Sequence, residues 1–146
     1  MQGKRQAGFL IAKIHYLSGR ILSRKLKHYK LNEINPGQGR ILFALWQGDG
    51  ITIQELAKKT SLGKSTLTSM LDRLENSGYL VRIPSKEDRR RIVIELTEKD
   101  KTLRSIYSQI SDEMIDLFYG GFTNKEIEGF ESYLKRVLDN LSSYEA

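Results

Sequence analysis

The most restrictive feature of this sequence is a pair of short helical patterns joined by a tight turn. Thr52 and Glu55 have the spacing of a capping box, which predicts a first helix over about residues 53–59. A second helix is predicted over about residues 64–77, and Gly63 lies in the turn between the two. The leucines that this second helix is expected to bury are Leu67, Leu71 and Leu74. Two helices connected in this way are typical of a helix-turn-helix motif.

Two strand patterns follow the second helix, over residues 79–83 and 91–96. Gly78 stands where a helix commonly ends with a left-handed residue. Residues 84–90, between the strands, are very polar. The strand side chains are expected to alternate, with one face formed by Ile92, Ile94 and Leu96 and the other by Val93 and Glu95. The predicted fold class is therefore mainly α with a small β-hairpin wing, a winged helix-turn-helix.

The outward face of the second helix carries short hydroxyl side chains bracketed by cations. In a helix-turn-helix the second helix enters the major groove of DNA, where the base edges can be distinguished. Hydroxyl groups reach phosphates or bases, and cations bind phosphates. The alternative is an ordinary solvated face, although such a face usually carries more Glu and Lys pairs. The residues predicted to contact DNA from this helix are Lys64, Ser65, Thr66, Thr68, Ser69 and Arg73.

Three consecutive arginines, Arg89, Arg90 and Arg91, stand at the end of the hairpin loop. An arginine at a wing tip can enter a minor groove narrowed by A·T base pairs, where the negative potential is enhanced. Asp88 beside them is interpreted either as a turn residue or as an ion-pair partner of Arg82 that braces the wing. We favour the ion pair because Arg82 and Asp88 lie on opposite limbs of the same loop.

Long helical patterns flank this central region. One amphipathic helix is predicted over about residues 8–30, and Pro36 suits the first turn of the helix that follows. Capping boxes that begin at Thr97 and Thr123 predict two more long helices, with Gly120-Gly121 between them. The apolar stripes of these long helices can be buried only against one another, and a second chain would supply the missing surface.

The predicted domains are a DNA-binding winged helix-turn-helix over residues 35–97 and a helical dimerisation region formed by residues 1–34 and 98–146. Charge is distributed unevenly over these segments. Residues 1–32 carry 8 Lys and Arg and no acidic residue, whereas residues 105–146 carry 8 Asp and Glu and 3 Lys and Arg. The basic and acidic ends suit each other as packing partners, within one chain or between two, although solvated faces remain the alternative.

Composition excludes several other classes of protein. The sequence contains no cysteine, which excludes disulfides, thiolate metal sites and thiol redox sensors. No apolar stretch approaches the roughly 18 residues of a membrane span, and the first residues do not read as a signal peptide. We therefore expect a cytoplasmic protein without a membrane partner. The net charge of +6 fits a polyanionic partner.

The wing region resembles that of a known family of bacterial and archaeal regulators, the MarR family. The resemblance rests on the run from Gly78 to Arg91, followed by Glu95-Leu96-Thr97. The helix-turn-helix is also similar, through Glu55-Leu56-Ala57, the segment 63–68 and the segment 72–75. More loosely, the order of helices, the Pro36 helix start and the paired terminal helices agree over nearly the whole chain.

This resemblance implies a homodimer that binds a palindromic operator in double-stranded DNA and is often released by small phenolic or anionic ligands. Asp88 and Arg90 match the paired wing residues of the family, with Arg90 in the minor groove. Arg91 departs from the small residue usual at its position, so its role is open. On this reading the protein is expected to be a repressor that needs no cofactor.

A ligand pocket of the family type would lie between the helical dimerisation region and the DNA-binding domain. Tyr16, Arg20 and Trp46 are plausible lining residues for a small aromatic or anionic effector. An ordinary core role for Trp46 is an equally good interpretation.

Other chemistry fails on spacing. Gly63-Lys64-Ser65 resembles the end of a phosphate-binding loop, but Lys58 stands where that motif needs glycine. His15 and His28 alone do not make a zinc site, and the scattered carboxylates offer no perturbed pair for catalysis. We therefore expect no metal and no enzymatic activity. The competing hypothesis is a winged-helix module for protein contacts, which should carry apolar anchors on the outward face of residues 64–73.

Overall fold

The computed structural model describes residues 4–31 and 33–146, which form two compact units, Met1–Ile110 and Ser111–Ala146. The second unit contains the end of helix α5 (Glu98–Phe118) and helix α6 (Asn124–Glu145). The predicted fold class, mainly α with a small hairpin wing, is confirmed. Before α5, the first unit contains in chain order α1 (Ala7–His28), α2 (Pro36–Trp46), β1 (Ile51–Thr52), α3 (Ile53–Thr60), α4 (Lys64–Asn76), β2 (Leu80–Pro84) and β3 (Ile92–Leu96).

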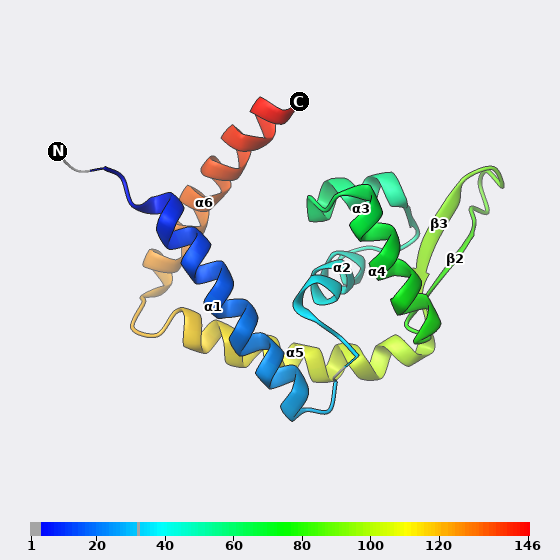
Figure 1. Cartoon of the computed structure of the whole chain (residues 1–146), viewed down its shortest axis with the longest axis horizontal. Coiled ribbons are helices and arrows are strands. Elements are labelled where there is room, and N and C mark those ends of the chain that lie inside the picture. The colour runs from blue at the N-terminus through cyan, green and yellow to red at the C-terminus, as the bar shows by residue number, and fades with distance from the viewer. Residues whose placement is uncertain (1–3, 32) are drawn as a thin grey trace. The chain divides into compact units, whose positions relative to one another are not determined.

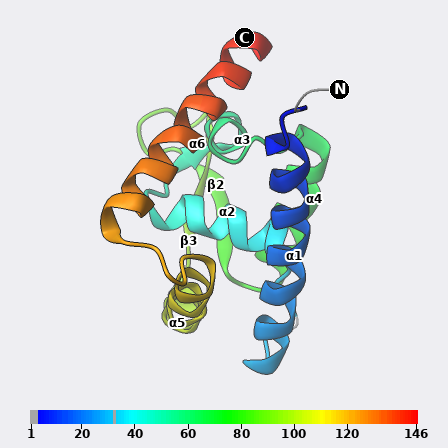
Figure 2. The same ribbon diagram turned by 90° about the vertical axis from the view of Figure 1, so that its left-hand side faces the viewer.

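Helix α2 is the central helix of the first unit. It lies between α1 and α4 (Figure 1), and the rotated view shows it running across α1 (Figure 2). Pro36 occupies its first turn as predicted, and a reciprocal pair of hydrogen bonds between Asn35 and Gln38, of 2.8 and 2.9 Å, caps it. Each fully buried aliphatic side chain stabilises the fold by about 1.5–3 kcal/mol. The core around α2 contains Ile41, Leu42, Leu45, Leu56, Leu67, Leu71, Leu74, Leu80 and Ile94.

Helix α4 has the predicted C-terminal cap, and Gly63 lies in the turn before the helix as predicted. Gly78 adopts a φ of 87°, and the Tyr79 N–H donates to the carbonyl of Leu74 at 3.0 Å, as in a Schellman motif. In this turn Ser61 is the left-handed residue, with a φ of 57°. Gly63 instead takes the extended N-cap position, with a φ of −65°.

The hairpin is part of a three-stranded antiparallel sheet with the strand order β1-β3-β2. Strand β1 was not predicted, because two residues are too few to show an alternating pattern. It pairs Ile51 with Ile94 and Thr52 with Val93. Thr52 also caps α3, since its hydroxyl oxygen accepts from the Glu55 N–H at 3.2 Å. The carboxylate of Glu55 accepts from the Thr52 hydroxyl at 3.1 Å rather than completing the predicted capping box.

Burial along β3 does not follow the two predicted faces throughout. Val93 is 8% exposed and belongs to the core, whereas Ile92 is 45% exposed. The pairing explains the difference, because β1 reaches only Val93 and Ile94 and therefore does not extend to Ile92. Ile92 pairs with Pro84 at the outer end of the hairpin, which projects beyond α4 (Figure 1).

The start of α5 also differs from the expectation of a capping box at Thr97. The Thr97 hydroxyl donates to the Gly78 carbonyl at 2.5 Å, so that it ties the start of α5 to the end of α4. Asp100 does not reach back as a capping residue but is buried, with 2% of its surface exposed. Both of its carboxylate oxygens accept from Trp46 Nε1, at 2.9 and 3.1 Å.

The second unit is a helical corner with an aromatic cluster. Gly121 takes a φ of 84° after α5, and the predicted capping box of Thr123 and Glu126 is formed, with hydrogen bonds of 2.8 and 3.1 Å. Phe130 of α6 contacts three aromatic residues of the corner, Phe118, Tyr119 and Phe122. Across residues 4–31 and 33–146, no helix is long and apolar enough to cross a membrane.

Candidate nucleic-acid interface

The outward face of α4 presents most of the predicted DNA-contacting side chains to solvent. Ser65, Thr66 and Ser69 are exposed on it, with Lys64 at the start of the helix. Thr68 is half-buried, and its hydroxyl donates to the Lys64 carbonyl at 2.8 Å. In a recognition helix, the residues near the N-terminus of the helix contact the base edges, and the hydroxyls of Ser65 and Thr66 lie in this part of α4.

Arg73 lies apart from this group, toward the C-terminal end of α4. It lines a polar groove of about 440 Å³ together with Glu33 and residues of the α2 N-terminus and the α4 C-terminus. Nine residues separate it from Lys64, which corresponds to about 14 Å along a helix. Arg73 is therefore placed to reach a different part of a bound duplex than Lys64.

The wing loop is held by its own hydrogen bonds and leaves Arg90 in solvent. The Asp88 carboxylate accepts from the backbone N–H of Arg90 at 3.1 Å and from its Nε at 3.2 Å. These two bonds from Arg90 lower the pKa of Asp88, so the carboxylate stays ionised. The side chain of Arg90 is 91% exposed, and Arg89 is also exposed at the tip.

The predicted ion pair between Arg82 and Asp88 is replaced by a different brace. Arg82 Nη2 contacts the Asp72 carboxylate and Arg82 Nε contacts the Glu75 carboxylate, each at 2.6 Å. Arg82 pairs with Ile94 within the ladder, and the tip loop begins only beyond Pro84. Its side chain therefore joins the wing to α4, the helix that carries the hydroxyl face, rather than to the tip.

Arg91 has a partner on α3. Its Nη2 lies 3.5 Å from the Glu55 carboxylate. The side chain of Arg91 is 59% exposed and that of Glu55 is 50% exposed. Exposed ion pairs of this kind contribute about 0–1 kcal/mol. Arg91 thus differs from Arg90, because its guanidinium faces the start of α3 instead of the open side of the wing.

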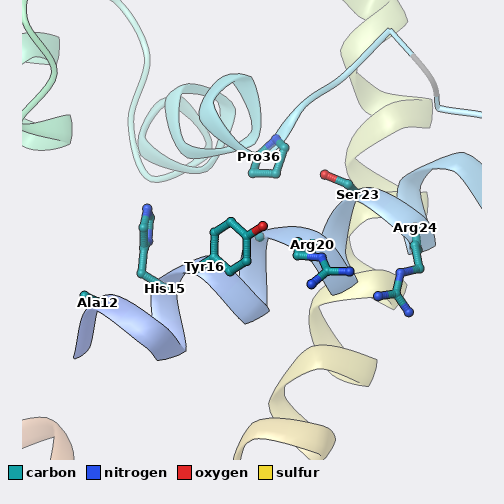
Figure 3. Close-up of a pocket in the computed structure, with 8 residues that line it drawn as sticks. Ala12, His15, Tyr16, Arg20, Ser23, Arg24 and Pro36 are labelled. Carbon is teal, nitrogen blue, oxygen red and sulfur yellow. The ribbon is translucent and has the colours of Figure 1, made fainter. Parts of the chain in front are cut away.

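An open groove on α1 brings together two of the three predicted effector-pocket residues. Tyr16 and Arg20 lie on the face of α1 where Pro36 begins α2 (Figure 3), and the Arg20 guanidinium lies 5.6 Å from the centre of the Tyr16 ring. The groove has a volume of about 640 Å³, and His15, Ser23 and Arg24 add polar groups to it.

Trp46 does not line this groove. Its indole N–H donates to the buried Asp100, and its ring makes an edge-to-face contact with Tyr107 at 5.2 Å. The structure therefore places Trp46 in the packing between α2 and α5. This position agrees with the core role that the sequence left open.

Apolar side chains outside the core gather on the two terminal helices. Those exposed on α1 are Phe9, Leu10, Ile11, Ile14 and Leu17, and those exposed on α6 are Leu134, Val137, Leu138 and Leu141. Exposed apolar surface that recurs along one helix marks an interaction surface. Neither set has a partner element that covers it within its own unit of the described chain.

Sequence reasoning missed the two carboxylates that hold Arg82. Asp72 and Glu75 are three residues apart and therefore lie on one side of α4. Two acidic residues with this spacing at the end of a helix, directly before the strand that contains Arg82, were the signal that could have identified them. The additional groove residues His15 and Arg24 carried no such signal, because their meeting with Pro36 depends on how α1 packs against α2.

These features define a winged helix-turn-helix protein, and comparison with known proteins identifies its family. The MarR family model matches residues 34–92. The organic hydroperoxide resistance transcriptional regulator of Bacillus subtilis is 30% identical over 128 residues, which cover 86% of this chain and 85% of the relative. The chain therefore belongs to the MarR family, whose members are transcriptional regulators and not enzymes.

Two further comparisons agree with this assignment. The HTH-type transcriptional regulator SarZ of Staphylococcus haemolyticus is 28% identical over 130 residues, 88% of this chain and 87% of the relative. A crystal structure of a cysteine-to-serine mutant of MarR from E. coli, complexed with operator DNA, superimposes with a TM-score of 0.77. That structure is 27% identical in sequence, and the match covers 90% of this chain and 92% of that chain.

Proposed function

We propose that this protein is a homodimeric repressor of transcription that acts in the cytoplasm, binds a palindromic operator in double-stranded DNA and is released by a small-molecule ligand. The observation that carries the proposal is the exposed hydroxyl face of α4 beside a wing whose tip exposes Arg89 and Arg90. This combination of two DNA-directed elements on one unit suits simultaneous contacts in neighbouring grooves. The similar MarR structure is a complex with operator DNA, which supports DNA as the partner.

In the proposed complex the two elements have different tasks. Helix α4 enters the major groove, where Thr66 and Ser69 contact base edges while Lys64 and Arg73 bind phosphates. Arg90 enters the minor groove, where its exposed guanidinium meets the enhanced negative potential of A·T-rich sequence. Arg82 keeps the two elements in register, because it joins β2 of the wing to Asp72 and Glu75 of α4.

The proposed dimer is supported by the surfaces of α1 and α6. Both helices expose a row of apolar side chains that a second copy of the chain would bury. Charge supports the same pairing, because α1 carries no acidic residue whereas residues 105–146 carry 8. A symmetric dimer also presents its two α4 helices to half-sites about one helical turn apart, which accounts for a palindromic operator.

The proposed ligand site is the groove on α1. Its lining offers an aromatic ring, Tyr16, and cations, Arg20 and Arg24, as a small aromatic anion would require. A ligand there can change DNA affinity only if it binds the DNA-binding and non-binding conformations with different affinities. The exposed face of α4 carries hydroxyls and cations rather than apolar anchors, which favours DNA over a protein as the partner of this unit.

The DNA-binding part of the proposal is tested by removing single hydroxyls from α4. Thr66→Ala and Ser69→Ala are each expected to lower the preference for a selected operator over random DNA, by about 1–3 kcal/mol for each lost base contact. Ser105→Ala, which removes an exposed hydroxyl from α5, is the matched control and should change neither affinity. The measurement is a binding titration with both DNAs. Equal losses on operator and random DNA would show that α4 does not read bases.

The dimer is tested by sedimentation equilibrium at micromolar concentration, where a mass of twice 16.8 kDa is expected. Leu141→Asp places a charge among the exposed apolar side chains of α6 and should shift the equilibrium toward the monomer, because an unpaired charge is costly to bury. Asn124→Asp at the exposed start of α6 adds the same single negative charge and is the control. A monomeric mass throughout this range would contradict the dimer and with it the palindromic operator.

A further inference from the structure

The buried carboxylate of Asp100 is the feature of the first unit that the proposed DNA and ligand sites do not use. Asp100 lies in the first turn of α5, is 2% exposed and receives hydrogen bonds from Trp46 Nε1 on both oxygens. Carboxylates are almost never buried to this degree without a cationic partner in direct contact. A single neutral indole N–H is a weak compensation for removing a charge from water.

We propose that Asp100 is a proton-binding site, with Trp46 as its hydrogen-bond donor, that makes the joint between α2 and α5 depend on pH. Four parts of the chain meet at this joint. Trp46 ends α2, Asp49 lies in the loop before β1, Tyr79 lies between α4 and β2, and Arg104 lies one turn beyond Asp100 on α5. Helix α5 itself continues from the first compact unit into the second, so the joint anchors the helix that leaves the winged unit.

The charges around Asp100 do not offset its burial. Burial raises the pKa of Asp100 above its ordinary value of 3.8, and the negative charge of Asp49 raises it further. The Trp46 hydrogen bond and the positive charge of Arg104 act in the opposite direction and are smaller than the effect of burial. Arg104 does not bond to Asp100 in this arrangement: its guanidinium lies 6.0 Å from the centre of the Trp46 ring, and its Nη2 donates to the Trp46 carbonyl at 3.4 Å.

The sign of the pH effect follows from this direction. Because the folded-state pKa of Asp100 is raised, the folded chain holds this proton over a pH range in which the unfolded chain has released it. Asp100 therefore favours the folded chain at acidic pH, and this contribution is lost as pH rises through the folded-state pKa. That trend is opposite to the one produced by carboxylates in surface ion pairs.

The sequence provides a direct probe, because Trp46 is its only tryptophan. The experiment is a pH titration of the fluorescence of the full chain, with far-UV circular dichroism at each pH to confirm that the chain stays folded. We expect a transition in Trp46 emission with a midpoint above 3.8, and its loss in Asp100→Asn, whose amide oxygen still accepts from the indole. Absence of a transition in the folded wild type, or its persistence in Asp100→Asn, would overturn the proposal.

Two variants of neighbouring residues should shift the midpoint of the transition in opposite directions. They test the proposal even if Asp100→Asn does not fold. Asp49→Asn keeps an acceptor for the Leu96 N–H, which Asp49 binds at 2.9 Å, but removes the repelling charge, so the midpoint should fall. Arg104→Gln removes the attracting charge, so the midpoint should rise. Loss of the transition in Asp49→Asn would assign it to Asp49 and reject Asp100. Unshifted midpoints, or shifts in one direction for both variants, would also reject the proposal.

Unfolding experiments provide an independent readout. Relative to the wild type, Asp100→Asn should be more stable at neutral pH than at acidic pH, because only the wild type regains stability when Asp100 binds its proton. The buried amide in Asp100→Asn changes the free energy of unfolding by an amount that does not depend on pH. The test is therefore whether the difference in stability between the two proteins changes with pH. A difference in unfolding midpoint that is the same at every pH would overturn the proposal.

Discussion

Replacement of Arg90 by alanine is expected to weaken operator binding roughly 10- to 100-fold for each arginine, the equivalent of a charge-assisted contact of about 1.5–3 kcal/mol. The Arg90 side chain is 91% exposed at the wing tip, so its loss removes the proposed DNA contact and the Nε bond to Asp88 but leaves the core packing unchanged. If both arginines of the proposed dimer displace counterions, the slope of log affinity against log salt should flatten by up to about 2. The measurement is operator binding over a range of salt concentrations.

Asp88→Ala separates contact from support within the same loop. This variant removes no cation, but it removes the acceptor for the Arg90 N–H and for Arg90 Nε. Affinity should fall because the loop loses order, while the salt slope stays nearly constant. Hydrogen exchange of residues 81–96 should show reduced protection in Asp88→Ala and unchanged protection in Arg90→Ala.

Lys125→Ala, which removes an exposed cation from the start of α6, controls for a general effect of charge on both quantities. Wild-type affinity in Arg90→Ala would exclude the wing from the DNA-binding surface. A salt slope that flattens as much in Asp88→Ala as in Arg90→Ala would show that the loop, and not the guanidinium, determines counterion release.

Gly39→Ala should destabilise the first unit, although alanine normally stabilises a helix relative to glycine. A Cβ atom at Gly39 of α2 would lie 2.0 Å from the hydroxyl oxygen and 2.8 Å from Cζ of Tyr107 on α5, so the ring would have to move. Overpacking a core costs about 1–3 kcal/mol, whereas the gain in helix propensity is about 1 kcal/mol or less. We expect a net loss of roughly 1–2 kcal/mol, since the overpacking is the larger effect.

Gly129→Ala is the matched control, because Gly129 lies inside α6 and a Cβ atom there would meet no atom within 4 Å. The same chemical change should therefore stabilise the chain by about 0.5–1 kcal/mol at this position. Tyr107→Phe combined with Gly39→Ala should recover only part of the loss, because the ring carbon at 2.8 Å remains. Urea unfolding at one protein concentration measures all three variants. A Gly39→Ala variant as stable as the wild type would contradict the close approach of α2 and α5.

Patterns that act over a few residues predicted much of the winged unit correctly. The helical spacing of Leu67, Leu71 and Leu74 identified the buried face of α4, and Gly78 identified its C-terminal cap. Both signals are local, because one helical turn determines which residues share a face and which residue must adopt a positive φ. The same locality explains why the hydroxyls opposite these leucines could be predicted to face outward.

Partners that lie far apart in the sequence could not be predicted in this way. Strand β1 is defined by its pairing with β3, and the buried Asp100 accepts its hydrogen bonds from Trp46, 54 residues away. Thr97 illustrates the same limit: its position satisfied a local capping rule, yet the carbonyl of Gly78 is the acceptor that packing brings within reach of its hydroxyl.

By itself, the sequence determined the class of fold, the composition of the outward face of α4 and the position of the arginines near the wing tip, because each depends on local order. Tertiary structure decided what these side chains bind within the chain. Arg82 was expected to pair with Asp88 across the hairpin loop, but the structure places it against Asp72 and Glu75 of α4. A charged side chain has several possible partners within reach of its flexible stem, and only the packing of strands against helices selects among them.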